Sequence, residues 1–284
     1  MQIAYIGDHS GRYNDDEGAI TYALESLGHK VCQIPEDGNY QRAEKCELVL
    51  FHHQHKHIDR LAKVNAPKVC WYFDLVYALE VRDERQNVDD LRSICSLFCC
   101  TDGGYTPSGI VHLPQGADNR ILGNTREPKI TPILYIGSTG MCDRLQQLSD
   151  LERKYGNDLL SITGRTGVFR KDLRKITSRT KIVISLQHPA NDRYWSNRVY
   201  IVCGFGGFML HPYCEQLANC YRDREEIVFY STRNEMVDLI DYYLEHDEER
   251  EHIATAGFEL TKKDHTYKHR CEKLVKAVKS RGIV

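Results

Sequence analysis

The stretch WSNRVYIVCGFGGFML, residues 195–210, has the pattern of a helix, a glycine-rich turn and a strand in direct succession. Two polar side chains, Asn197 and Arg198, precede an apolar run that is typical of a buried helix. The succession predicts one corner of a doubly wound α/β domain, in which ligands lie beyond the carboxyl ends of the strands. Because glycine lets the backbone approach a ligand or a neighbouring strand, Gly206 and Gly207 belong either to a binding site or only to a tight turn.

Two similar β/α series extend on either side of a polar, aperiodic segment, residues 119–131, which is the best linker candidate. The motif ILYIG at residues 133–137 echoes IAYIG at residues 3–7. Strands are predicted at residues 3–6, 30–34, 47–51, 68–73, 96–101, 110–113, 133–136, 159–163, 181–186, 208–210 and 227–230. The fold class is therefore α/β, with two Rossmann-like domains, residues 1–125 and 126–284, facing across a cleft.

Composition limits the possible environments of the chain. A net charge of −2 gives no overall signature of nucleic-acid binding, and 41% apolar residues suffice for packed cores. The eleven cysteines are scattered mostly through apolar runs without a CxxC motif, and no secretory signal precedes them. No apolar run is long enough to span a bilayer. We therefore expect a cytoplasmic protein without disulfides or a membrane span.

The carboxyl-terminal segment, residues 262–281, is strongly basic. It carries eight lysines and arginines against two acidic residues, a local charge of +6. A solvated amphipathic helix explains such a run, and contact with phosphate or nucleic acid is the alternative.

Candidate catalytic residues of the first half follow predicted strands. Residues 52–57 contain four histidines, which are consistent with a surface loop, with a cleft lined by His52 or His53, or with a metal site. Asp74 follows a strand, where a carboxylate is well placed as a general base or as a helix N-cap. His9 lies in the glycine-bearing loop after the first strand, and its neutral imidazole can accept a proton near pH 7.

The second half resembles a known family in the order and spacing of its motifs. These are Gly137-Ser138, Arg144 before an apolar helix, SNRVY at residues 196–200, Gly206-Gly207, EIV at residues 226–228, Ala256-Gly257 and the histidines and arginine of residues 265–270. This pattern resembles the CgeB-like (spore maturation protein) branch of group 1 glycosyltransferases, over about residues 130–275.

The resemblance implies the GT-B fold, with the final helix crossing back onto the first domain. It also implies that the second domain holds a nucleotide-diphosphate sugar, first of all a UDP-sugar, and that the first domain holds an acceptor hydroxyl. Transfer would need neither a bound metal nor a permanently bound cofactor. The acceptor is left open among a glycan, a small molecule, a protein and a hydroxylated base in DNA, and the oligomeric state is open as well.

Sugar transfer builds negative charge on the diphosphate, so the site needs cations and fixed N–H donors. Arg198 is the first candidate, because a guanidinium binds phosphate oxygens in a bidentate manner. The catalytic residues expected are Asp74, His9 and Arg198. The donor-binding residues expected are Gly137, Ser138, Arg144, Gly164, Arg165, Tyr194, Asn197, Arg198, Gly206, Gly207 and Glu215.

The chain departs from the family at one position. The family reads Arg-Val-Phe-Glu-Ala-Leu where this chain reads RVYIVC, so the glutamate that would hold the ribose is Ile201. Glu215 is the residue expected to replace it as an acceptor for a ribose hydroxyl. The alternatives are a catalytically inactive, nucleotide-sugar-binding or regulatory module, and a nucleotide-sugar epimerase.

Overall fold

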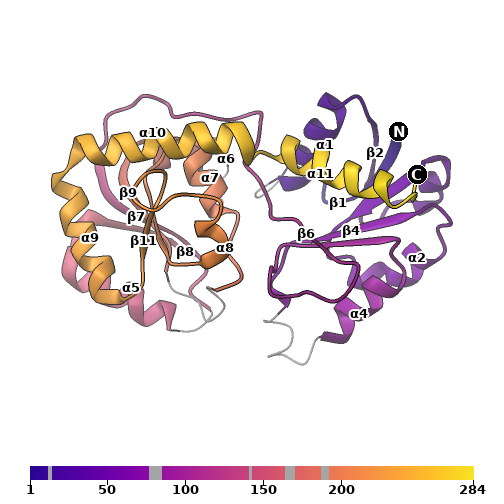
Figure 1. Cartoon of the computed structure of the whole chain (residues 1–284), viewed down its shortest axis with the longest axis horizontal. Helices are drawn as coiled ribbons and strands as arrows, with labels where there is room; N and C mark the ends of the chain where they lie inside the picture. Colours follow the sequence, from indigo (N-terminus) through magenta and orange to yellow (C-terminus); the bar gives the residue numbers. More distant parts are fainter. Residues whose placement is uncertain (12–14, 77–84, 141–142, 164–169, 187–191) are drawn as a thin grey trace. The chain divides into compact units, whose positions relative to one another are not determined.

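The computed structural model describes residues 1–11, 15–76, 85–140, 143–163, 170–186 and 192–284, and its strands form two parallel sheets (Figure 1). The strand order is β2-β1-β3-β4-β5-β6 in the first sheet and β11-β10-β9-β7-β8 in the second. Parallel neighbours cannot be joined by a hairpin, so the chain returns through a crossover segment before each new strand. The predicted fold class, two Rossmann-like α/β domains, is confirmed.

The first sheet and its helices come from the amino-terminal part of the chain and from its last helix. Its strands are β1 Gln2–Gly7, β2 Lys30–Pro35, β3 Leu48–Phe51, β4 Lys68–Tyr72, β5 Leu97–Cys100 and β6 Val111–His112. Its helices are α1 Asp16–Ser26, η1 Tyr40–Lys45, η2 His55–His57, α2 Ile58–Ala62, α4 Arg85–Ser93 and α11 Tyr267–Ser280.

The second sheet is built from the carboxyl-terminal half of the chain. Its strands are β7 Thr131–Gly137, β8 Leu159–Thr163, β9 Thr180–Ile184, β10 Met209–Pro212 and β11 Val228–Tyr230. Its helices are α5 Arg144–Tyr155, η3 Gly156–Asp158, α6 Arg170–Ser178, α7 Arg198–Gly204, α8 Glu215–Ala218, α9 Arg233–Glu245 and α10 Asp247–Asp264. The short helix α8 has no counterpart in the sequence prediction, because four residues are too few to display a helical period.

The chain divides into two compact units, the first being Met1–Arg120 with Thr266–Val284 and the second Ile121–His265. This division differs from the expected domains 1–125 and 126–284, because the last segment belongs to the first unit. Figure 1 shows α11 alongside α1. The apolar side chains of α11 enter the same core as α1, β1 and β4, through Tyr267, Cys271, Leu274, Val275 and Val278.

The stretch that opened the sequence analysis folds as predicted, into helix α7, a turn and strand β10. Trp195 is 6% exposed, and its Nε1 donates a hydrogen bond to Tyr200 Oη at 3.0 Å. The indole of Trp195 therefore packs in the core rather than being exposed for stacking on a ligand.

Gly257, in the middle of α10, allows this helix to lie directly on the backbone of Glu226. A Cβ built on Gly257 would overlap the Glu226 carbonyl oxygen and come 3.8 Å from Cys203 Sγ. The glycine of the Ala256-Gly257 motif therefore serves close packing within the second unit.

We predict that Gly257→Ala lowers the free energy of unfolding by about 1–3 kcal/mol, the usual cost of overpacking. Helix propensity alone predicts the opposite sign, a gain of about 1 kcal/mol. Thermal and urea unfolding followed by circular dichroism would measure the change. Thr255→Ala, at an exposed site of the same helix, is the control and should not lower the free energy of unfolding by a comparable amount. A Gly257→Ala protein as stable as the wild type would contradict the packing argument.

Candidate active site

Each sheet has one switch point, at which the order of its strands reverses: the chain adds the next strands on one side of a central strand and then on its other side. In the second sheet β7 lies between β8 and β9, and in the first sheet β1 lies between β2 and β3. Ligands of doubly wound domains bind at such switch points, beyond the carboxyl ends of the strands. The loops after β7 and β9, and those after β1 and β3, are therefore where the chemistry of each unit should gather.

Arg198 lies at the switch point of the second sheet. It is the first residue of α7, and its guanidinium is in contact with the backbone of Gly137, where a Cβ would overlap Arg198 Nη2. Arg198 Nη1 donates to Ser185 Oγ, just past β9, at 3.5 Å. The ring centroid of Tyr135 lies 6.0 Å from the Arg198 Cζ. Gly137 is thus required for the guanidinium to approach the end of β7.

Arg144, the first residue of α5, brings a second guanidinium into the electrostatic field of Arg198. Its Nη1 donates to the carbonyl oxygen of Ser138 at 3.4 Å, and among described residues its buried Nε has no hydrogen-bond partner. Burial lowers the pKa of Arg198, and the charge of Arg144 lowers it further. Neither arginine pairs with a carboxylate within the described ranges, so the pair favours an anionic ligand.

His211, at the carboxyl end of β10, was not anticipated from the sequence. It is 4% exposed, and its one hydrogen bond within the described part of the chain runs from Nδ1 to Pro212 O at 2.7 Å. Burial lowers its pKa to about 4, and the charges of Arg198 and Arg144 act in the same direction. Because a carbonyl can only accept, Nδ1 carries the proton and Nε2 is left as an acceptor. In the sequence, the one sign of a role for His211 is its position directly after the apolar run of residues 208–210.

The other residues expected at the donor are placed as follows. Tyr194 is partly buried and close enough to act on the pKa of Arg198. Asn197 is the N-cap residue of α7, although its side chain makes no capping bond. Glu215 is exposed in the first turn of α8, three residues beyond the end of β10. Gly164 and Arg165 lie outside the described residues.

Gly206 and Gly207 lie away from this site, at the opposite edge of the second sheet. Helix α7 begins at the edge of the sheet where the strands end, and it runs back to the edge where they begin. The turn between α7 and β10, which contains both glycines, therefore lies at the amino ends of the strands. The N–H groups of Gly206 and Gly207 donate to Cys203 O and Val202 O, each at 2.9 Å. A Cβ on Gly207 would be 2.7 Å from Thr177 Cγ2. These two glycines therefore serve the turn and its packing rather than a ligand, which corrects the expectation from sequence.

His9 lies at the switch point of the first sheet, in the loop after β1. Its Nε2 donates to Tyr5 O at 2.8 Å, and Nδ1 is buried without a hydrogen-bond partner among described residues. Since Nε2 must carry the proton in this bond, Nδ1 holds the free lone pair. The geometry suits a proton acceptor.

Behind His9, a buried chain of hydrogen bonds links three strands. His52 Nδ1 donates to Trp71 O at 2.5 Å, and Tyr5 Oη donates to His52 Nε2 at 2.5 Å. Burial lowers the pKa of His52 to about 3, so the ring is neutral at pH 7. His52 is therefore part of the core, whereas the neighbouring His53 Nδ1 is 3.6 Å from Asp74 Oδ2.

Asp74 is the most open of the catalytic candidates. It follows β4 by two residues, and its side chain is 72% exposed. The backbone N–H of Phe73 donates to His53 Nε2 at 3.3 Å, which places the His53 proton on Nδ1, facing Asp74. Asp74 and His53 thus form a pair at the ends of β4 and β3, beside the switch point.

Glu17, in the first turn of α1, is a second residue that the sequence did not single out. Its carboxyl lies against Gly7, where a Cβ would be 2.9 Å from Glu17 Cγ and 3.3 Å from its Oε1. Burial raises the pKa of Glu17 to about 7, with the charges of Asp16 and Asp8 acting in the same direction. A carboxyl that titrates near neutrality at the end of β1 is able to exchange protons.

In the described ranges, no three histidine, cysteine, aspartate or glutamate side chains come together as a metal site would require. In the same part of the chain, no helix has the length and apolar character needed to cross a membrane.

Solved structures share this fold over almost the whole chain. HepE of Anabaena in complex with UDP and glucose has a TM-score of 0.68, covering 99% of this chain and 100% of that chain at 11% identity. T4 phage β-glucosyltransferase has a TM-score of 0.64, covering 98% and 99% at 13% identity. Sucrose-phosphate synthase from Thermosynechococcus elongatus has a TM-score of 0.69, covering 99% and 98% at 11% identity. Such low identities establish the fold alone, and no curated protein matches the sequence.

The shared architecture is the GT-B fold of glycosyltransferases. Residues 130–276, just over half of the chain, match the family described as glycosyl transferase-like, and the protein belongs to this family. It is accordingly a glycosyltransferase, an enzyme that moves a sugar from a nucleotide sugar to an acceptor.

We predict that Glu17→Gln raises the free energy of unfolding at pH 8 by about 1–3 kcal/mol and leaves it nearly unchanged at pH 4.5. The folded pKa of about 7 lies above the usual value of 4.5, so the native state penalises the ionised carboxylate. That penalty develops as pH rises from 4.5 to 7 and is complete above 7.

Urea unfolding of both proteins across this pH range would measure the difference. Glu25→Gln, at an exposed position of the same helix, is the control and should show no comparable pH dependence. A difference between Glu17→Gln and wild type that stays constant with pH would contradict the burial of this carboxyl.

Proposed function

We propose that the second unit holds the diphosphate of a nucleotide sugar, a UDP-sugar first of all, and that the enzyme belongs to the CgeB-like branch. The order of motifs in residues 130–275 supports the branch. One observation carries the donor site: Arg198 and Arg144 meet at the switch point of the second sheet without a carboxylate partner in the described residues. The UDP complex of HepE, which has the same fold, is consistent with this choice of donor.

In this proposal the two guanidinium groups stabilise the leaving group. Breaking the anomeric C–O bond leaves negative charge on the diphosphate, and preorganised cations at that position lower the barrier. Arg198 can bind two phosphate oxygens at once, while Arg144 adds a second charge. The same pair would make the transfer independent of a metal ion.

The acceptor hydroxyl must lose its proton if transfer inverts the anomeric centre. We rank His9 first as the base, because its Nδ1 lies at the switch point of the first sheet and makes no hydrogen bond within the described ranges. Asp74, the first choice from the sequence, follows β4 and is separated from β1 by β3. We place Glu17 as a proton relay for the same loop, given its pKa of about 7.

In this chain Ile201 stands where the family has the glutamate that would hold the ribose, so another residue must accept the hydrogen bond from the donor. Ile201 provides no acceptor, but His211 Nε2, at the end of β10, makes no hydrogen bond to the described residues, and Glu215 is the third residue after this strand. We propose that His211 accepts a hydrogen bond from a hydroxyl of the donor and that Glu215 is placed for the ribose.

We predict that UDP and one UDP-sugar raise the melting temperature of the wild type, since a ligand that binds only the native state stabilises it. Arg198→Ala should weaken UDP binding about 10–100-fold, the scale of a lost charge-assisted hydrogen bond, and abolish turnover. Calorimetric titration with UDP would measure the loss of affinity.

Arg153→Ala, at an exposed site of α5 with its side chain 73% exposed, is the control and should bind UDP as the wild type does. Folded Arg198→Ala protein with full UDP affinity would overturn the phosphate site. UDP binding without turnover or donor hydrolysis would favour the inactive module, and conversion of the donor without an acceptor would indicate an epimerase.

We also predict that His9→Ala lowers kcat by about 10²–10⁴, the scale of a lost general base, with little change in the affinity for UDP. Asp74→Asn should lower kcat less, because Asp74 is open to solvent. Release of UDP in the presence of acceptor, measured in EDTA, would report both rates. A large loss in Asp74→Asn with none in His9→Ala would assign the base to Asp74.

A further inference from the structure

The outer face of α11 carries a row of lysines that the proposed reaction does not use. The helix buries an apolar stripe in the first unit, and the opposite face presents Lys273, Lys276 and Lys279, all exposed. Their spacing of three residues sets the Cα atoms about 4.5 Å apart along the axis and turns the row gradually around the helix. The result is an oblique ridge of three ammonium groups, which we call the α11 lysine ridge.

The positive charge of the ridge is not neutralised locally. None of the three lysines forms an ion pair with a carboxylate in the part of the chain that the structure describes, and Glu272 is the one acidic residue of α11. Arg281 follows directly and donates to the carbonyl oxygen of Gly109 at 3.0 Å. The ridge stands out because the whole chain has a net charge of −2.

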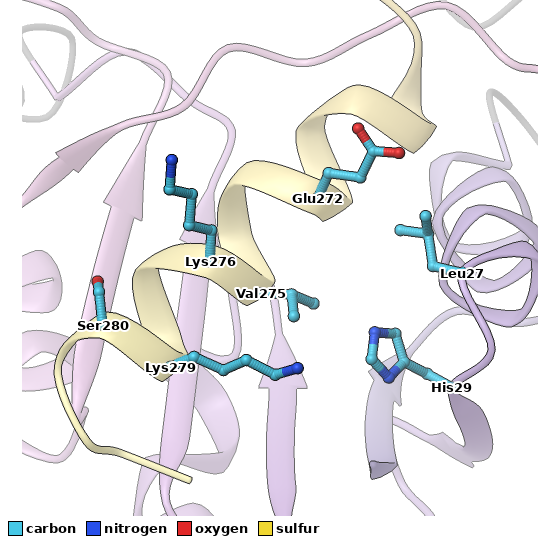
Figure 2. Close-up of a pocket in the computed structure, with 7 residues that line it drawn as sticks. All are labelled: Leu27, His29, Glu272, Val275, Lys276, Lys279 and Ser280. Carbon is cyan, nitrogen blue, oxygen red and sulfur yellow. The ribbon is translucent and has the colours of Figure 1, made fainter.

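An open groove of about 620 Å³ runs beside the ridge, between α11 and the turn after α1. Figure 2 shows Val275 and Leu27 facing each other across it, with Lys279 directed toward His29. Lys276 also lines this groove. Partial burial lowers the pKa of His29, and nearby positive charges that include Lys279 lower it further. Two of the three lysines, Lys276 and Lys279, thus bring positive charge to this groove.

The side chains on this face favour one kind of polyanionic partner over two others, a membrane surface and a single-stranded nucleic acid. A helix that lies on a membrane inserts large apolar side chains, and a surface for single strands offers aromatic rings to the bases. The described side chains of α11 include no large apolar or aromatic group among the exposed hydrophobic residues. A row of cations alone matches the regular phosphates of a duplex, which attract lysines regardless of sequence.

We propose that the α11 lysine ridge binds the phosphate backbone of double-stranded DNA. The contact lies on the first unit, on the outer face of a helix whose other face forms part of the core. It is independent of the donor site and would tether the enzyme to a duplex without reading its sequence.

The test is the affinity of the full chain for a fluorescent, mixed-sequence DNA duplex of about 20 base pairs, followed by anisotropy from about 50 to 200 mM salt. The triple variant Lys273→Gln, Lys276→Gln, Lys279→Gln should bind at least about tenfold more weakly at the lowest salt. The slope of log affinity against log salt should become shallower by roughly 3, close to one unit for each lost phosphate contact.

The matched control is Lys45→Gln, Lys56→Gln, Lys63→Gln. It makes the same change of charge at exposed positions in a region that packs on the other core of the first sheet. This control should keep the affinity and the salt slope of the wild type. Equal losses in both triple variants would overturn the ridge in favour of a general charge effect.

Two further outcomes would also overturn the proposal. One is wild-type protein that fails to bind the duplex at about 50 mM salt. The other is wild-type protein that binds anionic phosphatidylserine vesicles through the same lysines but not DNA. UDP binding by the ridge variant should match the wild type, so a failure of the donor site would be seen separately from a failure of the ridge.

Discussion

The parallel pairing of both sheets is the constraint on which the rest of the structure depends. Every strand must be followed by a return crossing, so loops that leave strands gather at one edge and loops that enter strands gather at the other. Arg198, Gly137, Ser185 and His211 come from different parts of the second half and meet at the first kind of edge. The same rule places the glycine turn before β10 at the opposite edge.

The two candidate sites are electrostatically different. In the second unit, partly buried guanidinium groups have no carboxylate partner among described residues, and their mutual repulsion persists until an anion arrives. In the first unit, the end of β1 has an imidazole nitrogen of His9 that makes no hydrogen bond to the described residues, and the carboxyl of Glu17, whose pKa burial raises to about 7. Transfer of a sugar from a diphosphate donor to a hydroxyl uses both kinds of site. Cations stabilise the negative charge of the leaving diphosphate, and a proton acceptor takes the proton of the hydroxyl.

Much of the architecture could be predicted because it has local causes. Runs of three to six residues with strong apolar character, ended by glycine or a polar residue, marked the strands. The segment around α11 was predicted as an amphipathic helix, and only the family resemblance, not its own residue pattern, implied that it packs on the first domain. Burial of Tyr267 and Leu274 with β1 settled that, and no local pattern encodes so distant a contact.

The sequence by itself determined the fold class and the membership of the glycosyltransferases, and it singled out Arg198 as a candidate, because periodicity and motif order reside in neighbouring residues. The tertiary structure decided which candidates share a site. It separated Gly206 and Gly207 from Arg198, and it added His211 and Glu17, whose surroundings depend on burial and on charges from other elements. The physical reason is that desolvation and electrostatic coupling act through space, and only the folded chain sets those distances.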